Sequence, residues 1–256
     1  MTGPRGVPFD DRGLLLGEGL FETVLARDGE LDHLAAHLDR LAAGCAVLGL
    51  PAPDRAAAEA VLLRALAPLG AARAAVRLTL TAGSGGRGLD RPQAPAPRLF
   101  ATAAPSPRPQ GPARLAVAAV RRNAGSPASR LKTLSYLDNI LAREEARAAG
   151  ADEALMLNTR DEVACAAAGN IFWIEDEVLF TPALDCGVLA GIARARVVDA
   201  ARRLGVEVCE VRAPLSAVSG AQAVFLTNSL VGVRPVVGLG GSAPHALVER
   251  LGSVFG

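Results

Sequence analysis

Lysine is almost absent from this sequence of 256 residues. Lys132 is the only one, and the other 26 of the 27 basic residues are arginines. In a chain so rich in Ala, Gly, Pro and Arg, a retained lysine suggests chemistry that arginine cannot perform. A guanidinium stays protonated, whereas a lysine amine can be neutralised by its surroundings and can attack an aldehyde. Composition alone leaves a chance surface lysine as the alternative.

Metal-binding and membrane-spanning patterns are also missing. The chain has three histidines and four cysteines, with no CxxC pair and no cysteine near a histidine at metal-ligand spacing, so a zinc site is not expected. No apolar run approaches the ~20 residues of a membrane span, and the start has no apolar signal segment. The net charge of +1 calls for neither nucleic acid nor a membrane surface as partner. We therefore expect a cytoplasmic protein that acts on a small molecule.

Helix and strand patterns are mixed along the chain without a regular alternation, which favours an α+β fold over a doubly wound sheet. The proline-rich segment 105–112 is the best linker candidate. We expect a small α+β domain over 1–107, an interdomain strand and loop over 108–130, and a larger domain over 131–256. Helices are expected at 33–49, 54–69, 135–149, 191–204 and 244–251, and strands at 74–82, 98–103, 114–121, 153–158, 170–175, 177–181, 206–211, 223–227 and 233–237.

Several short motifs follow one another in a characteristic order over nearly the whole chain. They are Asp11-Arg12-Gly13, Gly17 to Thr23 (GEGLFET), His37 to Leu41 (HLDRL), Leu131 to Tyr136 (LKTLSY), Asn170-Ile171-Phe172, Thr181-Pro182, Gly187, Gly191-Ile192, Arg194, Thr227-Asn228-Ser229 and Pro235. No single motif is specific, but the ordered set resembles the fold-type IV pyridoxal-phosphate enzymes. That family includes branched-chain and D-amino-acid aminotransferases and aminodeoxychorismate lyase. The resemblance implies two domains with a cleft between them, and a homodimer.

The resemblance also implies roles for individual residues, with pyridoxal 5'-phosphate as the cofactor of the C-terminal domain. Lys132 matches the lysine that forms the Schiff base and then moves protons at the substrate carbon. Tyr136 matches a tyrosine at the cofactor's 3-hydroxyl, and it would share a face with Lys132 if the segment were helical. Arg40 matches the phosphate arginine. The remaining phosphate ligands would be backbone N–H groups of Gly191, Ile192 and Ala193 at a helix start, and the hydroxyl of Ser229.

Cys165 departs from the family pattern. Alignment through Asn170 places it where a glutamate normally faces the pyridine nitrogen and keeps it protonated. A thiol is only a weak donor, and Glu162, three residues away on a strand, would point to the opposite face. Either the cofactor works with a neutral nitrogen, or the activity is reduced or altered.

The glycine-rich segment 83–88 (GSGGRG) is the best guide to subclass. Within the family it resembles aminodeoxychorismate lyase, and Arg87 could bind a substrate carboxylate; a plain flexible hairpin is the alternative. We therefore expect a lyase that converts 4-amino-4-deoxychorismate to 4-aminobenzoate and pyruvate for folate synthesis. The alternatives are a class IV aminotransferase for branched-chain or D-amino acids, and a weak or inactive family member because of Cys165.

Overall fold

The computed structural model describes residues 6–240 and 244–255. The chain forms two compact units. The first unit ends at Pro107 and also contains Leu131–Ser135, whereas the second comprises Arg108–Arg130 and the chain from Tyr136 onward. Residues 108–130, expected as a separate connecting region, thus group with the second unit. The expected α+β class is confirmed.

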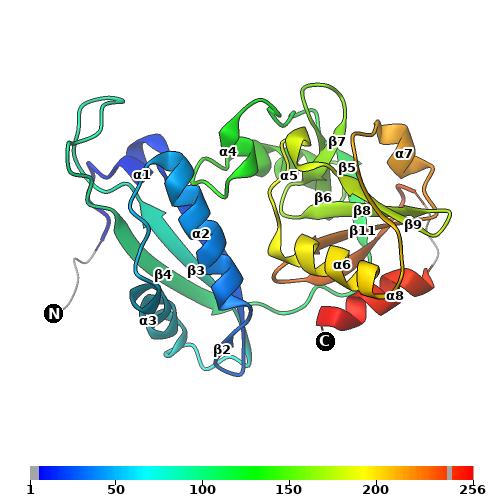
Figure 1. Cartoon of the computed structure of the whole chain (residues 1–256), viewed down its shortest axis with the longest axis horizontal. Helices are drawn as coiled ribbons and strands as arrows, with labels where there is room; N and C mark the ends of the chain where they lie inside the picture. The colour runs from blue at the N-terminus through cyan, green and yellow to red at the C-terminus, as the bar shows by residue number, and fades with distance from the viewer. Residues whose placement is uncertain (1–5, 241–243, 256) are drawn as a thin grey trace. The chain divides into compact units, whose positions relative to one another are not determined.

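The first unit is built on an antiparallel sheet with strand order β2-β1-β3-β4. Helices α2 and α3 pack on this sheet (Figure 1). Successive side chains of a strand point to opposite faces, so Leu20, Val24 and Ala26 of β1 share one face and join the core with both helices. The elements are α1 (Arg12–Leu16), β1 (Gly19–Arg27), β2 (Glu30–Leu31), α2 (Leu34–Leu48), α3 (Arg55–Leu66), β3 (Arg73–Thr81) and β4 (Arg98–Pro105).

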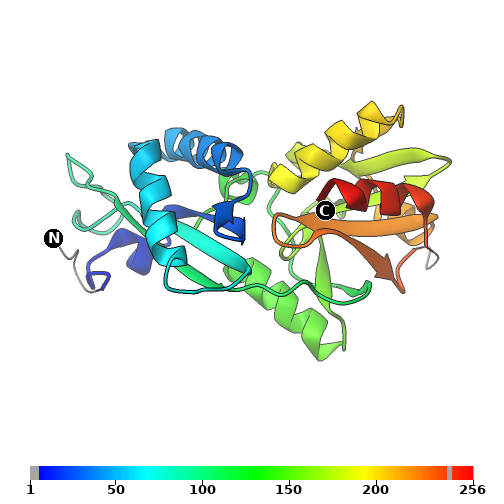
Figure 2. The ribbon, with the colours of Figure 1, turned by 90° about the horizontal axis from the view of Figure 1, so that it is seen from below.

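The second unit contains a mixed sheet with strand order β10-β9-β8-β11-β12-β5-β6-β7. Helices α6 and α8 lie side by side on one face, where they enclose Phe172 and Phe225, and α5 packs near β5 and β6 on the opposite face (Figure 2). The strands are β5 (Ala113–Val117), β6 (Glu153–Leu157), β7 (Val163–Ala166), β8 (Asn170–Glu175), β9 (Val178–Pro182), β10 (Val208–Val211), β11 (Ala223–Asn228) and β12 (Gly232–Val237). The helices are α4 (Pro127–Arg130), α5 (Leu137–Ala148), α6 (Ile192–Arg203), α7 (Leu215–Ser219) and α8 (Ala246–Gly252), with short 3₁₀ turns at Leu184–Cys186 and Ser253–Phe255.

Two local features differ from what the sequence indicated. The condition for Lys132 and Tyr136 to share a helical face is not met, because helix α5 begins at Leu137. Lys132 lies instead in a short non-helical segment whose backbone is hydrogen-bonded to β1. The four-residue strand β7 was also missed, since its sequence Val-Ala-Cys-Ala carries too little alternation to be recognised.

Within the part of the chain that the structure describes, no helix is both long and apolar enough to cross a membrane.

Candidate active site

Lys132 is fixed by backbone pairing along β1. Phe21 N donates to Lys132 O at 2.9 Å, and Leu134 N donates to Gly19 O at 3.0 Å. The ammonium nitrogen of Lys132 lies 4.3 Å from the centre of the Phe21 ring, a cation–π distance. The lysine is therefore held on a sheet rather than at the end of a mobile loop.

The surroundings of Lys132 favour its neutral form. The pKa of Lys132 is lowered from 10.5 to about 8, chiefly by burial and also by the positive charges of Arg40 and Arg77, while the negative charge of Glu22 opposes them. Burial disfavours the charged form of an amine because it removes solvating water. The unprotonated fraction near neutral pH is therefore far larger than that of an ordinary lysine, and the unprotonated amine is the form that acts as a nucleophile or general base.

Arg40 reaches the same region from α2 and pairs with Glu22 of β1. Arg40 Nε donates to Glu22 Oε1 at 2.8 Å, and Arg40 Nη2 donates to Oε2 at 2.6 Å. A guanidinium has five N–H donors, so one arginine can bind a carboxylate and a phosphate together. Arg40 is thus placed near Lys132 by a bidentate ion pair.

The glycine-rich segment 83–88 is ordered around the buried Arg12 of α1. Arg12 pairs with Glu18, which also pairs with Arg91. The Arg12 guanidinium donates to four loop carbonyls, those of Gly85, Gly88, Leu89 and Asp90, at 3.0–3.3 Å. Gly86 has φ +80°, and a Cβ there would collide with the carbonyl oxygen of Asp90. The loop therefore has a defined shape, with Arg87 exposed on it.

In the second unit, the N-terminus of α6 has the features of an anion site. Gly191 is its N-cap residue, and a Cβ there would collide with Asn170 Oδ1. Asn170 Nδ2 donates to Leu189 O at 3.0 Å and so holds the turn before the helix. Because Gly191 has no side chain, a ligand can approach the backbone N–H groups of Ile192 and Ala193 closely. The helix dipole favours a negatively charged ligand at this end.

The end of β11 lies beside Asn170, the residue that holds the turn before α6, because Thr227 of β11 pairs with Asn170 of β8. Thr227 Oγ1 is buried and has no hydrogen-bond partner among the residues that the structure describes. Asn228 Oδ1 accepts from the N–H groups of Leu230 and Val231, each at 2.9 Å, and shapes the turn that carries Ser229. An unsatisfied hydroxyl beside a helix N-terminus suits a ligand rich in acceptors, such as a phosphate.

Cys165 lies buried on β7 opposite Met156 of β6. Burial raises the pKa of the Cys165 thiol, although the positive charge of Arg122 lowers it in part. The thiol is therefore neutral at pH 7. Arg122 is itself buried, and it donates to three neutral acceptors: Gly187 O at 3.4 Å, Asn139 Oδ1 at 3.0 Å and Ser129 O.

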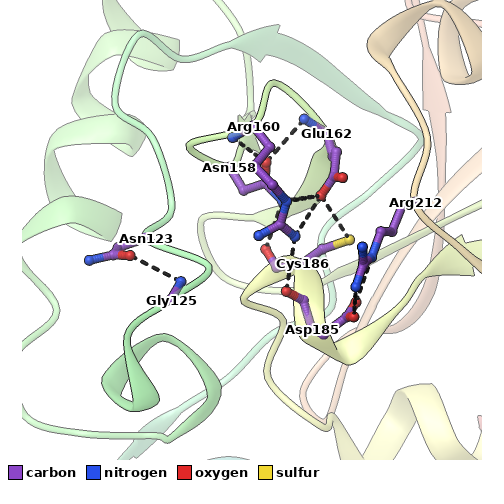
Figure 3. Close-up of polar contacts among 8 residues, drawn as sticks. All are labelled: Asn123, Gly125, Asn158, Arg160, Glu162, Asp185, Cys186 and Arg212. Carbon is purple, nitrogen blue, oxygen red and sulfur yellow. Dashed lines mark hydrogen bonds and ion pairs between the residues drawn. The ribbon is translucent and has the colours of Figure 1, made fainter.

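Glu162 lies in a polar cluster of its own. It precedes β7, and its carboxylate accepts from Asn158 Nδ2 and Arg160 Nη2, each at 2.7 Å, with Cys186 Sγ at 3.6 Å (Figure 3). The hydrogen bond from Arg160 holds the pKa of Glu162 below its ordinary value. Glu162 is thus an anion whose partners lie in this separate polar cluster.

The expected site residues divide between the two units. Lys132 and Arg40 lie near each other in the first unit, and Arg87 lies in a loop of the same unit. The second unit contains Tyr136 at the N-cap of α5, Cys165, the Gly191–Ile192–Ala193 turn and Ser229.

Three further residues escaped the sequence interpretation. Arg12 and Thr227 appear in the sequence only as members of motifs, without a role of their own, and Arg122 looks like one surface arginine among many. Only burial distinguishes them. Glu22 and His37 also occur only inside motifs, and their spacing in the sequence gives no sign that their side chains meet.

Comparison with known proteins identifies the family of the chain. The family model described as Amino-transferase class IV matches residues 19–239. A protein of Methanocaldococcus jannaschii provisionally named branched-chain-amino-acid aminotransferase is 34% identical over 90% of this chain and 82% of its own length. The aminodeoxychorismate lyase of Vibrio harveyi is 29% identical over 95% of this chain and 90% of its own. The crystal structure of 4-amino-4-deoxychorismate lyase from Pseudomonas aeruginosa is 32% identical, with a TM-score of 0.89, covering 98% of this chain and 94% of that one. The chain therefore belongs to the class IV aminotransferase family.

Proposed function

We propose that this protein is a pyridoxal-phosphate-dependent lyase that converts 4-amino-4-deoxychorismate to 4-aminobenzoate and pyruvate. The observation that carries the proposal is the ordered loop over residues 83–90, which presents Arg87 on a scaffold of carbonyls held by Arg12. The substrate bears carboxylates, and a guanidinium is well suited to bind one. Similarity to lyases from Vibrio harveyi and Pseudomonas aeruginosa supports the same assignment.

The residues present fit pyridoxal phosphate at its aldehyde and phosphate ends. Lys132 offers a readily neutralised amine for the aldehyde. Arg40 offers a guanidinium for the phosphate, and in the second unit the turn at Gly191–Ile192–Ala193 and Ser229 offer helix N-terminal amides and a hydroxyl. Thr227 Oγ1, in the strand before Ser229, has no hydrogen-bond partner among the described residues. When bound, the cofactor supplies an electron-withdrawing ring that stabilises negative charge at the substrate carbon. Tyr136 is proposed to contact the ring hydroxyl.

The chain's own part in the reaction is to orient the substrate and move one proton. Arg87 binds a carboxylate of the substrate. The neutral Lys132 amine takes the proton from the ring carbon that carries the amino group. Loss of that proton and cleavage of the ring C–O bond leave aromatic 4-aminobenzoate and enolpyruvate. The enolpyruvate takes one proton at its methylene carbon, in place of the proton lost from the ring, and so becomes pyruvate.

A direct assay tests the proposal. Purified protein with pyridoxal phosphate is mixed with 4-amino-4-deoxychorismate, and 4-aminobenzoate and pyruvate are measured by chromatography. We expect both products in equal amounts, and neither with Lys132→Ala. Formation of 4-aminobenzoate no faster than in the absence of enzyme would reject the lyase assignment.

An aminotransferase is the second candidate, favoured by the 34% identity to the Methanocaldococcus jannaschii protein. This reaction would transfer the amino group of a branched-chain or D-amino acid to a 2-oxo acid. Mixing the protein with L-leucine or D-alanine and 2-oxoglutarate, and measuring glutamate, distinguishes it from the lyase.

The neutral thiol at Cys165 supports a third candidate, a family member of weak activity. The family's glutamate stabilises a protonated ring nitrogen, and a buried thiol supplies no such charge. Binding of pyridoxal phosphate without turnover in either assay would favour this candidate.

A further inference from the structure

The carboxylate of Glu22 is one of the most deeply buried charges in the described chain, and the proposed reaction assigns it no role. Its side chain is 1% exposed, as is that of His37. By strand alternation, Glu22 lies on the face of β1 that carries Leu20 and Val24 into the core with α2. A buried charge is costly unless it is paired and hydrogen-bonded. Retaining it inside an apolar face therefore calls for a specific use.

Both oxygens of the Glu22 carboxylate are engaged by α2. Oε1 accepts from Arg40 Nε at 2.8 Å, and Oε2 accepts from Arg40 Nη2 at 2.6 Å. His37 Nδ1 lies 2.7 Å from Oε2. His37 and Arg40 stand three residues apart on α2 and so share a helix face. Two parallel bonds fix the plane of the guanidinium, and the histidine fixes the carboxylate.

The Glu22 carboxylate lies near three cationic side chains, those of Arg40, Arg77 and Lys132. Arg40 and Arg77 lower the pKa of Lys132, whereas Glu22 raises it. Burial raises the pKa of Glu22, but hydrogen bonds from Arg40 and His37 outweigh this effect, so its pKa lies below the ordinary value. Glu22 is therefore ionised at neutral pH, and its charge is felt at Lys132.

We propose that Glu22 and His37 are positioning residues that hold the Arg40 guanidinium in one orientation for an anionic group, with the Glu22 charge balancing the cations around Lys132. The inference rests on the proposed function in one respect: the anion is taken to be the phosphate of pyridoxal phosphate. Neither residue needs to touch the cofactor.

The ratio of affinities for pyridoxal phosphate and pyridoxal isolates the contribution of the phosphate. Cofactor-free protein is titrated with each compound, and binding is followed by absorbance. We expect Arg40→Gln and Glu22→Gln each to lower the preference for pyridoxal phosphate by roughly tenfold or more, the effect of one charged hydrogen bond, with little change for pyridoxal.

Matched variants separate positioning from general loss of structure. Glu18→Gln removes a carboxylate that pairs with two arginines in the same unit, and it should leave the affinity ratio unchanged. His37→Phe keeps a ring but removes the hydrogen bond, and it should lower the ratio, whereas His37→Asn retains an N–H donor and should restore much of it. These two variants also test the proposal if Glu22→Gln fails to fold.

A second measurement needs no cofactor. Protein labelled with ¹³C at the lysine ε-carbon gives one signal, because the chain has one lysine. Its titration should have a midpoint near pH 8 in the parent and a lower one in Glu22→Gln, since an anion has been removed.

The outcomes distinguish failure of the proposed cofactor from failure of the positioning proposal. If the parent protein binds no pyridoxal phosphate, the proposed cofactor fails, while the lysine titration still tests the role of the Glu22 charge. If Arg40→Gln lowers the ratio and Glu22→Gln and His37→Phe do not, positioning by Glu22 and His37 is overturned. If Arg40→Gln leaves the ratio unchanged, the phosphate assignment and the positioning proposal both fail.

Discussion

Burial acts on Lys132 and Cys165 in opposite chemical senses. In both residues it disfavours the charged form. For the amine of Lys132 the neutral form is the reactive one, and its pKa falls to about 8. For the thiol of Cys165 the neutral form is the unreactive one, and its pKa rises. Burial thus favours the reactive neutral amine of Lys132, whereas it leaves Cys165 with an uncharged thiol that supplies no negative charge.

The reaction of Lys132 with pyridoxal phosphate should depend on pH as its amine does. Trapping with borohydride, followed by peptide mapping, should place the label on Lys132. The initial labelling rate should rise with pH toward a midpoint near 8, because the neutral amine is the attacking form. Lys132→Arg should give no label, since a guanidinium stays protonated. Labelling of the parent elsewhere would contradict the assignment.

Cys165→Glu should restore a negative charge where the family places one. The new carboxylate would be stabilised by the positive charge of Arg122, which already acts on Cys165. We expect faster deprotonation of bound amino acids, by at least tenfold, measured by stopped-flow absorbance; such a change corresponds to about 1.4 kcal/mol. Cys165→Gln, of similar size but uncharged, is the control. Equal rates in both variants would indicate that the charge is not felt at the reacting centre.

At the level of elements, the loop over 83–90 and the turn before α6 are stabilised in the same way. In each, a polar side chain donates hydrogen bonds to backbone carbonyls of a glycine-containing turn. Arg12 does this for the loop through four carbonyls, and Asn170 does it before α6 through Leu189 O. Both turns include glycines at which a Cβ would collide with neighbouring atoms.

Arg12→Lys should loosen the loop without removing a positive charge. A lysine has three donors on one nitrogen and cannot match the planar fork of arginine. We expect the amides of residues 85–90 to exchange with deuterium at least tenfold faster, with smaller changes in α2 and α3. Arg27→Lys, which alters an arginine of β1 that pairs with Asp32, serves as control. Unchanged exchange in Arg12→Lys would show that the loop is ordered by other contacts.

The sequence predicted the long periodic elements well and the paired segments poorly. Helices α2 and α6 follow from apolar spacing and from the glycines at their ends. Strand β7 and the pairing of Lys132 with β1 could not be predicted, because they depend on partners distant in sequence. The same reason explains why the structural roles of Arg12 and Arg122 could not be predicted, because tertiary contacts set the burial of both side chains.

At the level of the whole molecule, large apolar side chains remain exposed around α1. Phe9 is 93% exposed and Leu89 84%, and Leu14, Leu15 and Leu16 are also exposed. The Leu89 carbonyl accepts from Arg12 of α1, which brings these residues to one region. Contiguous exposed apolar surface marks interaction sites, and we expect a second copy of the chain to cover it in a homodimer.

Leu15→Glu should therefore shift the protein toward monomer. A buried charge in an apolar interface is costly, and the apolar area removed from water contributes roughly 25 cal/mol per Å². Sedimentation velocity at micromolar concentrations measures the change. Leu204→Glu, at an exposed leucine of the second unit, is the control. A monomeric parent would refute the homodimer.

The pairing of Leu131–Ser135 with β1 has a consequence for proteolysis. A protease that cuts only after lysine has one possible cleavage point in this chain, and the backbone around that point is hydrogen-bonded to Phe21 and Gly19. Cleavage of the folded protein must wait until this short segment separates from the strand. When separation and re-pairing are fast relative to cleavage, the rate of the single cut measures the fraction of molecules in which the segment around Lys132 is open.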